Sequence, residues 1–371
     1  MAELRAELRA DEARCGFESL VPEAVAAAGI AVPFYAASGS KDNTVRLWGV
    51  DDGECKRVLV GAHVHRGAAE LEREGNLGMV WSVAFAPARP GEAALLASGS
   101  TDGTIRLWGV DDGECKRVLE GHSGTVYSVA FAPARPGEAA LLASGADDNT
   151  VRLWGVDDGE CKLVLEGHSG TELGLSVYSV AFAPARPGEA ALLASGAGDK
   201  TVRLWGGECK RVLQGHSGYV RSVAFAPARP GEAALLASGS QDKTVRLWGV
   251  DDGECKRVLK GHSWVYSVAF APARPGEAAL LASGSLDRTV RLWGVDDGEC
   301  KRVLEGHLAS PVWSVAFAPA RPGEAALLAS ASEDNTVRLW GVDDGECKRV
   351  LKGHSNSVLS VNIGYVLPDQ N

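Results

Sequence analysis

The sequence predicts an all-β protein in which seven copies of one unit close into a ring. The tripeptide Arg-Leu-Trp occurs seven times, in steps of 43 to 60 residues by subtraction of the Trp positions. Self-similarity at one period of this size indicates an array of a single supersecondary unit. The complete copies also hold four strand-length apolar runs, and the two ends of the chain hold complementary parts of one unit. The repeated tryptophans are Trp48, Trp108, Trp154, Trp205, Trp248, Trp293 and Trp340.

The copy over 121–166 shows the four runs most clearly. They cover 126–131, 141–144, 150–154 and 161–165, and Gly, Pro or Asp residues bound each of them. None reaches the roughly 10 residues that a helix assignment needs. We therefore expect each unit to be a four-stranded antiparallel meander.

Alternation along these runs predicts that both faces of each sheet are buried. In the first run Val129 and Phe131 point one way and Ala130 the other. Neither face is polar throughout, and large residues on one sheet can interdigitate with small residues on the next. A sheet buried on both faces by copies of itself, seven times over, indicates a seven-bladed β-propeller.

Ring closure follows from the two ends of the array. The first copy starts at 33–40 and lacks the Ser-Val-Ala-Phe strand, whereas the last copy ends with an unpaired first strand at 358–363. If this C-terminal strand joins the first blade, seven sheets are complete and no edge is left open. The predicted organisation is an N-terminal extension over 1–32, a propeller over 33–366 and a tail over 367–371.

Three markers recur in phase with the Trp residues and resemble the WD-repeat β-propellers over roughly 33–366. They are a Gly-His near the start of the unit, an Asp in a tight turn and the Trp that closes the third strand. The family's Trp-Asp dipeptide is Trp-Gly in every copy here. The histidines are His63, His122, His168, His216, His262, His307 and His354, and the turn aspartates are Asp42, Asp102, Asp148, Asp199, Asp242, Asp287 and Asp334.

The resemblance implies a buried hydrogen-bonded chain of His, Ser, Asp and Trp within each blade. A buried indole N–H needs an acceptor and a buried imidazole needs partners for both nitrogens, which supports the assignment. The expected members are His122, Ser144, Asp148 and Trp154 in one blade, and His354, Ser38, Asp42 and Trp48 in the blade that closes the ring. The Asp missing after each Trp lies outside this chain, so we expect the tetrads to persist.

Composition narrows the classes of partner. The formal net charge of −10 disfavours nucleic acid, because duplex binding depends on neutralising phosphates. No run of 18 apolar residues exists, so we expect no membrane insertion.

Seven of the eight cysteines recur at one repeat position on separate outer strands, too far apart for disulfides. Such thiols favour a reducing, intracellular and cytoplasmic location, and their separation argues against a metal site.

The N-terminal extension stands apart from the repeats. Leu4 and Leu8 lie four residues apart with Glu and Arg between them, which predicts a short helix. The segment lacks the apolar core of a secretory signal. It either docks a partner or lies against the propeller.

Differences between the copies gather at four places that would share one end of the ring. They are the residues before and after the turn Asp, the start of the first strand, and the loop after Gly-His. Aromatic residues and Arg, which are enriched at binding hot spots, collect there. The alternative is that they only cap the blade packing at the mouth of the channel. The predicted partner-binding residues are Trp81, Tyr127, Tyr178, Tyr219, Arg221, Trp264, Tyr266 and Trp313.

The copies also differ by two insertions, and most of them carry an Arg in the loop at the opposite end. Insertions at 63–79 and 171–176 fall on the aromatic end, where they either carry function or record drift between copies. At the opposite end, an Arg such as Arg135 is followed three residues later by Glu. Solvated turn charges of this kind contribute little to stability. A site for an anionic partner is the alternative.

No catalytic constellation, phosphate-cradling glycine loop or metal-ligand cluster appears in the sequence. We therefore expect no enzyme activity, no cofactor and no small-molecule substrate. The leading hypothesis is a non-catalytic scaffold that binds other proteins or peptides on its aromatic-rich end. The alternative is a structural subunit of a large multiprotein assembly, docked by its N-terminal segment and loops. An enzyme that uses the channel mouth is the least favoured hypothesis.

Overall fold

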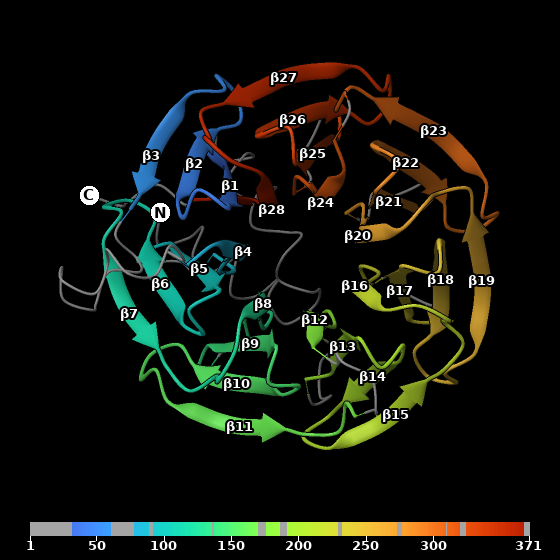
Figure 1. The fold of residues 1–371 in the computed structure, drawn as a ribbon, viewed down its shortest axis with the longest axis horizontal. Coiled ribbons are helices and arrows are strands. Elements are labelled where there is room, and N and C mark those ends of the chain that lie inside the picture. Colours follow the sequence, from blue (N-terminus) through green and yellow to red (C-terminus); the bar gives the residue numbers. More distant parts are fainter. Residues whose placement is uncertain are drawn as a thin grey trace, which may run out of the picture.

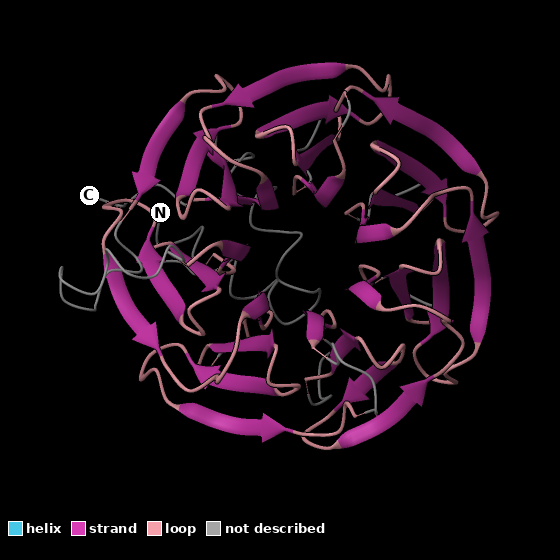
Figure 2. Ribbon diagram, viewed as in Figure 1, coloured by secondary structure: helices cyan, strands magenta, loops and turns pink. Residues whose placement is uncertain are grey.

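The computed structural model describes residues 32–60, 78–88, 92–135, 137–169, 176–185, 191–228, 232–272, 277–308, 310–319 and 324–366. Within these residues, 28 strands form seven four-stranded antiparallel sheets. Figure 1 shows the sheets arranged as blades around a common centre, and Figure 2 shows that loops join the strands. The prediction of a seven-bladed all-β propeller is confirmed.

The blades are described from their innermost to their outermost strand. The first three blades are β28 (Val358–Tyr365), β1 (Phe34–Ser40), β2 (Val45–Gly49) and β3 (Cys55–Leu59); β4 (Val80–Phe85), β5 (Leu95–Ser100), β6 (Ile105–Gly109) and β7 (Cys115–Leu119); and β8 (Val126–Phe131), β9 (Leu141–Ala146), β10 (Val151–Gly155) and β11 (Cys161–Leu165).

The remaining four blades repeat this order. They are β12 (Val177–Phe182), β13 (Leu193–Ala197), β14 (Val202–Trp205) and β15 (Cys209–Leu213); β16 (Val220–Phe225), β17 (Leu235–Ser240), β18 (Thr244–Gly249) and β19 (Cys255–Lys260); β20 (Val265–Phe270), β21 (Leu280–Ser285), β22 (Thr289–Gly294) and β23 (Cys300–Glu305); and β24 (Val312–Phe317), β25 (Leu327–Ser332), β26 (Thr336–Gly341) and β27 (Cys347–Lys352).

The predicted closure through the C-terminal strand is confirmed. β28 pairs antiparallel with β1, with Phe34 opposite Tyr365 and Ser38 opposite Val361. The strand runs two residues further than its apolar pattern predicts, because Phe34 and Tyr35 continue the pairing with Tyr365 and Gly364. Figure 1 shows the last strand of the chain as the innermost strand of the first blade.

The core lies between neighbouring blades rather than within one sheet. Trp154 of the third blade, for example, is buried in one cluster with Ile105 and Leu107 of the second. Gly145 shows how closely the sheets approach, because a Cβ there would lie 2.6 Å from Val177 Cγ1 of the next blade. The expected packing of large residues against small ones is therefore the packing that holds the ring together.

A serine hydroxyl from each blade accepts a hydrogen bond from a backbone N–H on the innermost strand of the next blade. The innermost strands are edge strands, and an edge exposes unpaired N–H groups. The Ser82 hydroxyl accepts from Val129 N at 3.0 Å, and the same bond recurs at all seven blade boundaries of the described ring. The last one closes the circle, because Val83 N donates to Ser360 Oγ at 3.1 Å.

An arginine on the outer strand clamps most of the blade boundaries. The Arg211 guanidinium donates to the backbone oxygens of Asp251 and Asp252 in the next blade, both at 2.9 Å. Equivalent bonds from Arg349 to Asp51 and Asp52 join the last blade to the first. The remaining donors of this kind are Arg57, Arg117, Arg257 and Arg302.

The boundary between the third and fourth blades lacks this clamp on both sides. Leu163 stands where the other outer strands carry Arg, and it packs on the core cluster of that boundary. The facing turn of the fourth blade is shortened to Gly206–Gly207 and has no Asp-Asp pair. The donor and its acceptor turn are thus absent together, at a single boundary.

Candidate interaction face

The order of the strands brings the variable positions to one end of the ring. In each blade the chain runs down the innermost strand, up the second, down the third and up the outermost. The turn after the second strand, the loop into the next blade and the start of each innermost strand therefore share one end. We call this end the variable face.

Buried hydrogen-bonded chains lie beneath the variable face. In the third blade Trp154 Nε1 donates to Ser144 Oγ at 2.8 Å, and His122 lies 2.7 Å from that oxygen through Nε2. His122 Nδ1 lies 2.8 Å from Asp148 Oδ2. If the histidine carries its proton on Nδ1, every donor has an acceptor: Trp donates to Ser, Ser to His, and His to Asp.

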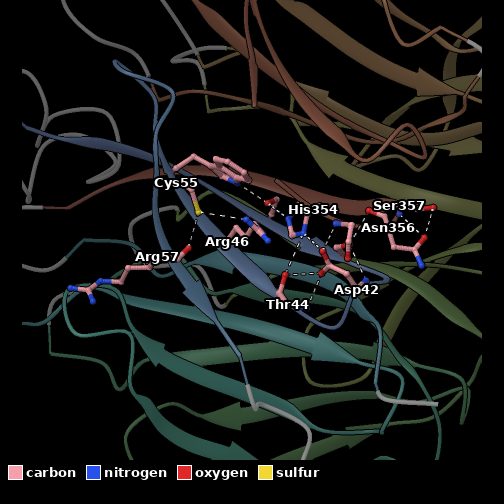
Figure 3. Close-up of polar contacts among 12 residues, drawn as sticks. Asp42, Thr44, Arg46, Cys55, Arg57, His354, Asn356 and Ser357 are labelled. Carbon is pink, nitrogen blue, oxygen red and sulfur yellow. Dashed lines mark hydrogen bonds and ion pairs between the residues drawn. The ribbon is translucent and has the colours of Figure 1, made fainter. Parts of the chain in front are cut away.

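The same chain closes the ring, as Figure 3 shows around His354 and Asp42. His354 lies 2.7 Å from Ser38 Oγ and 2.8 Å from Asp42 Oδ2, and Trp48 donates to Ser38 at 2.8 Å. His354 is more than three hundred positions away in the sequence from its partners Ser38 and Asp42. The equivalent contacts fall within 2.6–2.8 Å in the blades of His168, His216, His262 and His307.

The second blade is described in part. Trp108 donates to Ser98 Oγ at 2.9 Å, and Thr104 donates to Asp102. His63, the predicted histidine of this blade, lies outside the described residues.

A threonine is the fifth member of each chain, and the sequence analysis missed it. Thr150 donates to Asp148 Oδ1 through both its hydroxyl, at 2.7 Å, and its backbone N–H, at 3.1 Å. Its constant place two residues after each turn Asp was the signal that could have revealed it.

The carboxylates of these chains are strongly stabilised in their charged form. Burial by itself raises the pKa of Asp148, but hydrogen bonds from His122 and Thr150 outweigh it and hold that pKa far below its usual range. The same balance lowers the pKa of Asp42, Asp199, Asp242, Asp287 and Asp334. The hydrogen-bonding groups of these His–Asp pairs are therefore occupied within the blades.

A β-bulge at the start of each innermost strand shapes the variable face. In the third blade Val126 pairs with Ala146 and Ser128 with Gly145, so Tyr127 has no partner on the second strand. The shift recurs in every blade, and bulges of this kind re-aim the side chain of the extra residue. The bulged residues, which we call the bulge ring, are Trp81, Tyr127, Tyr178, Arg221, Tyr266, Trp313 and Leu359.

Members of the bulge ring contact one another from blade to blade. Trp81 lies edge-on to Tyr127 with ring centroids 5.2 Å apart, and Tyr127 lies 5.3 Å from Tyr178. On the other side, Tyr266 and Trp313 stack at 4.4 Å. The structure therefore brings six of the eight predicted partner-binding residues into one ring around the axis.

The other two predicted residues lie beside this ring. Tyr219 stacks on Tyr178 at 6.1 Å. Trp264 is 41% exposed, which is high for an indole. The sequence analysis missed Leu308, which is 84% exposed in the loop after its Gly-His. Lys41 occupies one of the variable positions before a turn Asp but is not among the predicted partner-binding residues; its ammonium lies 5.8 Å from the Trp313 ring centroid.

At the opposite end, Arg135 lies 3.6 Å from Glu138, which is largely exposed. The other arginines of that series lie outside the described residues, as do the N-terminal extension and most of both insertions. The seven cysteines of the outer strands are free and exposed. Across the described ranges, no three His, Cys, Asp or Glu side chains are grouped to hold a metal ion, and no helix is long and apolar enough to cross a membrane.

Blade geometry, repeated tetrads and closure through the terminal strand together define a closed propeller of tandem repeats. The family model described as WD domain, G-beta repeat matches residues 70–109, 113–155, 159–206, 207–249, 253–294 and 298–341, well over half of the chain. The chain belongs to this WD-repeat family. Six segments match although the ring has seven blades, because the blade of β28, β1, β2 and β3 is split between the two ends of the chain.

One curated relative is similar over a short stretch. The chain is 38% identical over 81 residues to eukaryotic translation initiation factor 3 subunit I from Aspergillus terreus. This match covers 22% of the present chain and 19% of the relative. The chain therefore aligns with only about a fifth of the relative's length.

Proposed function

We propose that this protein is a non-catalytic scaffold that binds protein or peptide partners on its variable face. The bulge ring is the observation that carries the proposal. The seven blades repeat their strands with little change, and the described buried chains recur among them, yet the residue re-aimed by each bulge varies and is large in every copy. Aromatic residues and Arg dominate the ring, and these types are enriched at binding hot spots.

Rigidity supports the same proposal. The His, Ser, Asp, Thr and Trp chains lie directly under the turns and loops of the variable face. Residues held on a rigid scaffold lose little conformational freedom when a partner binds. In contrast, the described His–Asp pairs have their hydrogen-bonding groups occupied within the blades, which is why we assign them no acid–base role.

The test is a paired scan of the two ends of the ring. Partners captured from a cell extract by the full chain are identified, and their affinities are measured for Trp81→Ala, Trp313→Ala and Arg135→Ala. We expect each Trp substitution to weaken binding by about 2 kcal/mol or more, roughly 30-fold, and Arg135→Ala to leave it unchanged. Affinity that fell only with Arg135→Ala would place binding at the opposite end.

A second candidate is a fixed structural subunit of a large multiprotein assembly. The similarity to translation initiation factor 3 subunit I favours it, because that relative is by its name one subunit of a larger factor. Native mass spectrometry of the captured material separates the two candidates. A stoichiometric assembly that survives dilution supports the subunit, whereas partners that exchange support the scaffold. Free thiols on every outer strand fit a reducing compartment such as the cytoplasm for either role.

A further inference from the structure

Cations outnumber acids in the bulge ring and at the residues on either side of each turn Asp, in a chain that is acidic as a whole. Apart from the turn aspartates themselves, which belong to the hydrogen-bonded chains below, these positions hold five cations and two acids, a net charge of +3, whereas the whole chain carries −10. The acids are Asp147 and Glu333, and Asp147 already accepts from Ser176 Oγ at 2.5 Å. The cations are Lys41, Lys200, Arg221, Lys243 and Arg288.

Two of these cations are held over aromatic rings close to the axis. The Arg221 guanidinium lies 4.0 Å from the ring centroid of Tyr178, and Lys41 lies over Trp313. The Gln241 amide satisfies both groups when it is oriented with its oxygen toward Arg221, where it would accept from Nε at 3.1 Å and from Nη2 at 3.0 Å. The Tyr178 ring therefore contacts one face of the Arg221 guanidinium and the Gln241 amide lies at one of its edges, so its position is set in the protein without a partner.

These side chains form one arc across five consecutive blades. The inner arc consists of Tyr178, Arg221, Tyr266, Trp313 and Lys41. Burial raises the pKa of the Tyr266 hydroxyl, the charge of Arg221 lowers it and the charge of Glu333 raises it, so both charged groups lie within electrostatic reach of this ring. The stacked rings of Tyr266 and Trp313 thus lie between a cation on one side and a cation on the other.

An unsatisfied donor lies within this arc. Trp313 Nε1 is buried and has no hydrogen-bond partner among the described residues. The equivalent indole of Trp81 donates to Thr101 Oγ1 at 3.0 Å, which shows that the bulge position can satisfy its own indole. A buried donor without an acceptor is unfavourable. An acceptor oxygen supplied from outside, beside the Lys41 ammonium, would relieve it.

We infer that the inner arc recognises an acidic peptide segment of a partner protein, with carboxylates on both sides of an apolar side chain. The apolar side chain packs against the edges of the Tyr266–Trp313 stack. One carboxylate meets Arg221, and the other meets Lys41 and the Trp313 N–H. This inference rests on the proposed function, because it names the chemistry of the partner for the same face.

The packing of the aromatic rings favours a peptide over single-stranded nucleic acid. Bases bind by stacking on aromatic faces that are open to them. Here Arg221 covers a face of Tyr178, and Tyr266 and Trp313 cover each other. The arc therefore presents cations and one N–H donor at the edges of rings that are already stacked, which suits carboxylates.

The experiment selects ligands for the full chain from a display library of short random peptides. A labelled peptide from the selection is then titrated by fluorescence anisotropy into the wild type, Arg221→Gln with Lys41→Gln, and Arg135→Gln as the control at the opposite end. We expect selected peptides to be rich in Asp and Glu around an apolar residue. The double variant should weaken binding at least tenfold, and Arg135→Gln should not. Unchanged melting of the variants shows that they fold.

The possible results of this experiment either support the inference or overturn it. Neutral or basic selected peptides, no selection at all, or full binding by the double variant would overturn it. Binding of an oligothymidylate that competes with the peptide and is lost in the double variant would assign the arc to nucleic acid instead. If acidic peptides fail while captured partners still depend on Trp81 and Trp313, the scaffold function stands and only the acidic partner is wrong. If captured partners are also insensitive, both proposals fail.

Discussion

At the scale of single residues, each turn aspartate of the described chains accepts several hydrogen bonds at once. Asp148 accepts from the His122 ring, from the Thr150 hydroxyl and backbone, and from the Ser123 backbone N–H. Its removal leaves donors unsatisfied in a mostly buried place, whereas a substitution of an exposed turn carboxylate does not.

Asp148→Ala should therefore lower the free energy of unfolding by about 1–3 kcal/mol, because a buried donor left without an acceptor loses about this much. Asp157→Ala is the matched control in the same blade, since this residue is exposed and offers its backbone oxygen to Arg117. The control should change stability by less than about 0.5 kcal/mol. Urea unfolding followed by Trp fluorescence measures both. Equal losses would show that Asp148 has no special role.

The lowered pKa values of these carboxylates predict a direction for pH dependence. A carboxyl whose pKa is lower in the folded state stabilises the fold fully above its unfolded pKa of about 3.9, and this contribution is lost as the pH falls below it. The stability difference between wild type and Asp148→Ala should thus be larger at neutral pH than near about pH 3. Urea titrations at both values provide the test. A difference that grew on acidification would reverse the sign.

At the scale of elements, the turn between the second and third strands holds a residue with positive φ, and in some blades this residue has a long side chain that disfavours such a conformation. The third position of this turn adopts a left-handed conformation in every blade described, with φ of 71° at Lys243 and 73° at Arg288. Lys200 has the same conformation with φ of 66°, and Gly103 and three asparagines occupy this place in the other four blades. Asn and Gly tolerate this region better than long side chains do.

Lys243→Asn should accordingly raise the free energy of unfolding by about 0.5–1 kcal/mol, because it relieves backbone strain at an exposed site. The reciprocal change, Gly103→Lys, should lower it by a similar amount or more, since a Cβ there would lie 3.0 Å from the His122 carbonyl oxygen. Melting curves of the two variants make the comparison. Shifts of the same sign would contradict the strain argument.

At the scale of the whole molecule, the ring is held by bonds that recur at its boundaries and by one strand from the far end of the chain. β28 pairs with β1, and its Ser360 and Val361 also bond to the inner strands of the blades on both sides. The boundary of Leu163 and Gly206 lacks the outer arginine clamp, so the ring is not uniform around its circumference.

Deletion of 358–371 should open the ring. The first blade would lose its innermost strand, and the exposed edge of β1 should cause aggregation or a large fall in melting temperature. Deletion of 367–371 alone is the control and should leave melting unchanged, because β28 stays in place. Size-exclusion chromatography with light scattering reads the association state. A monomeric 358–371 deletion with wild-type melting would refute closure by β28.

Sequence alone determined the number of blades, their four strands and the closing strand, because these depend on local alternation and on markers that recur in phase. The members of the tetrads came from the resemblance to the WD-repeat family, and the expected contacts are present in the blades whose histidine is described. It also placed the variable positions at one end, since strand order decides which turns share an end. Only the tertiary structure decided which side chains meet across blades. The bulge that re-aims Tyr127, the cation seated on Tyr178 and the unsatisfied indole of Trp313 depend on how neighbouring sheets approach, and no local pattern encodes that distance.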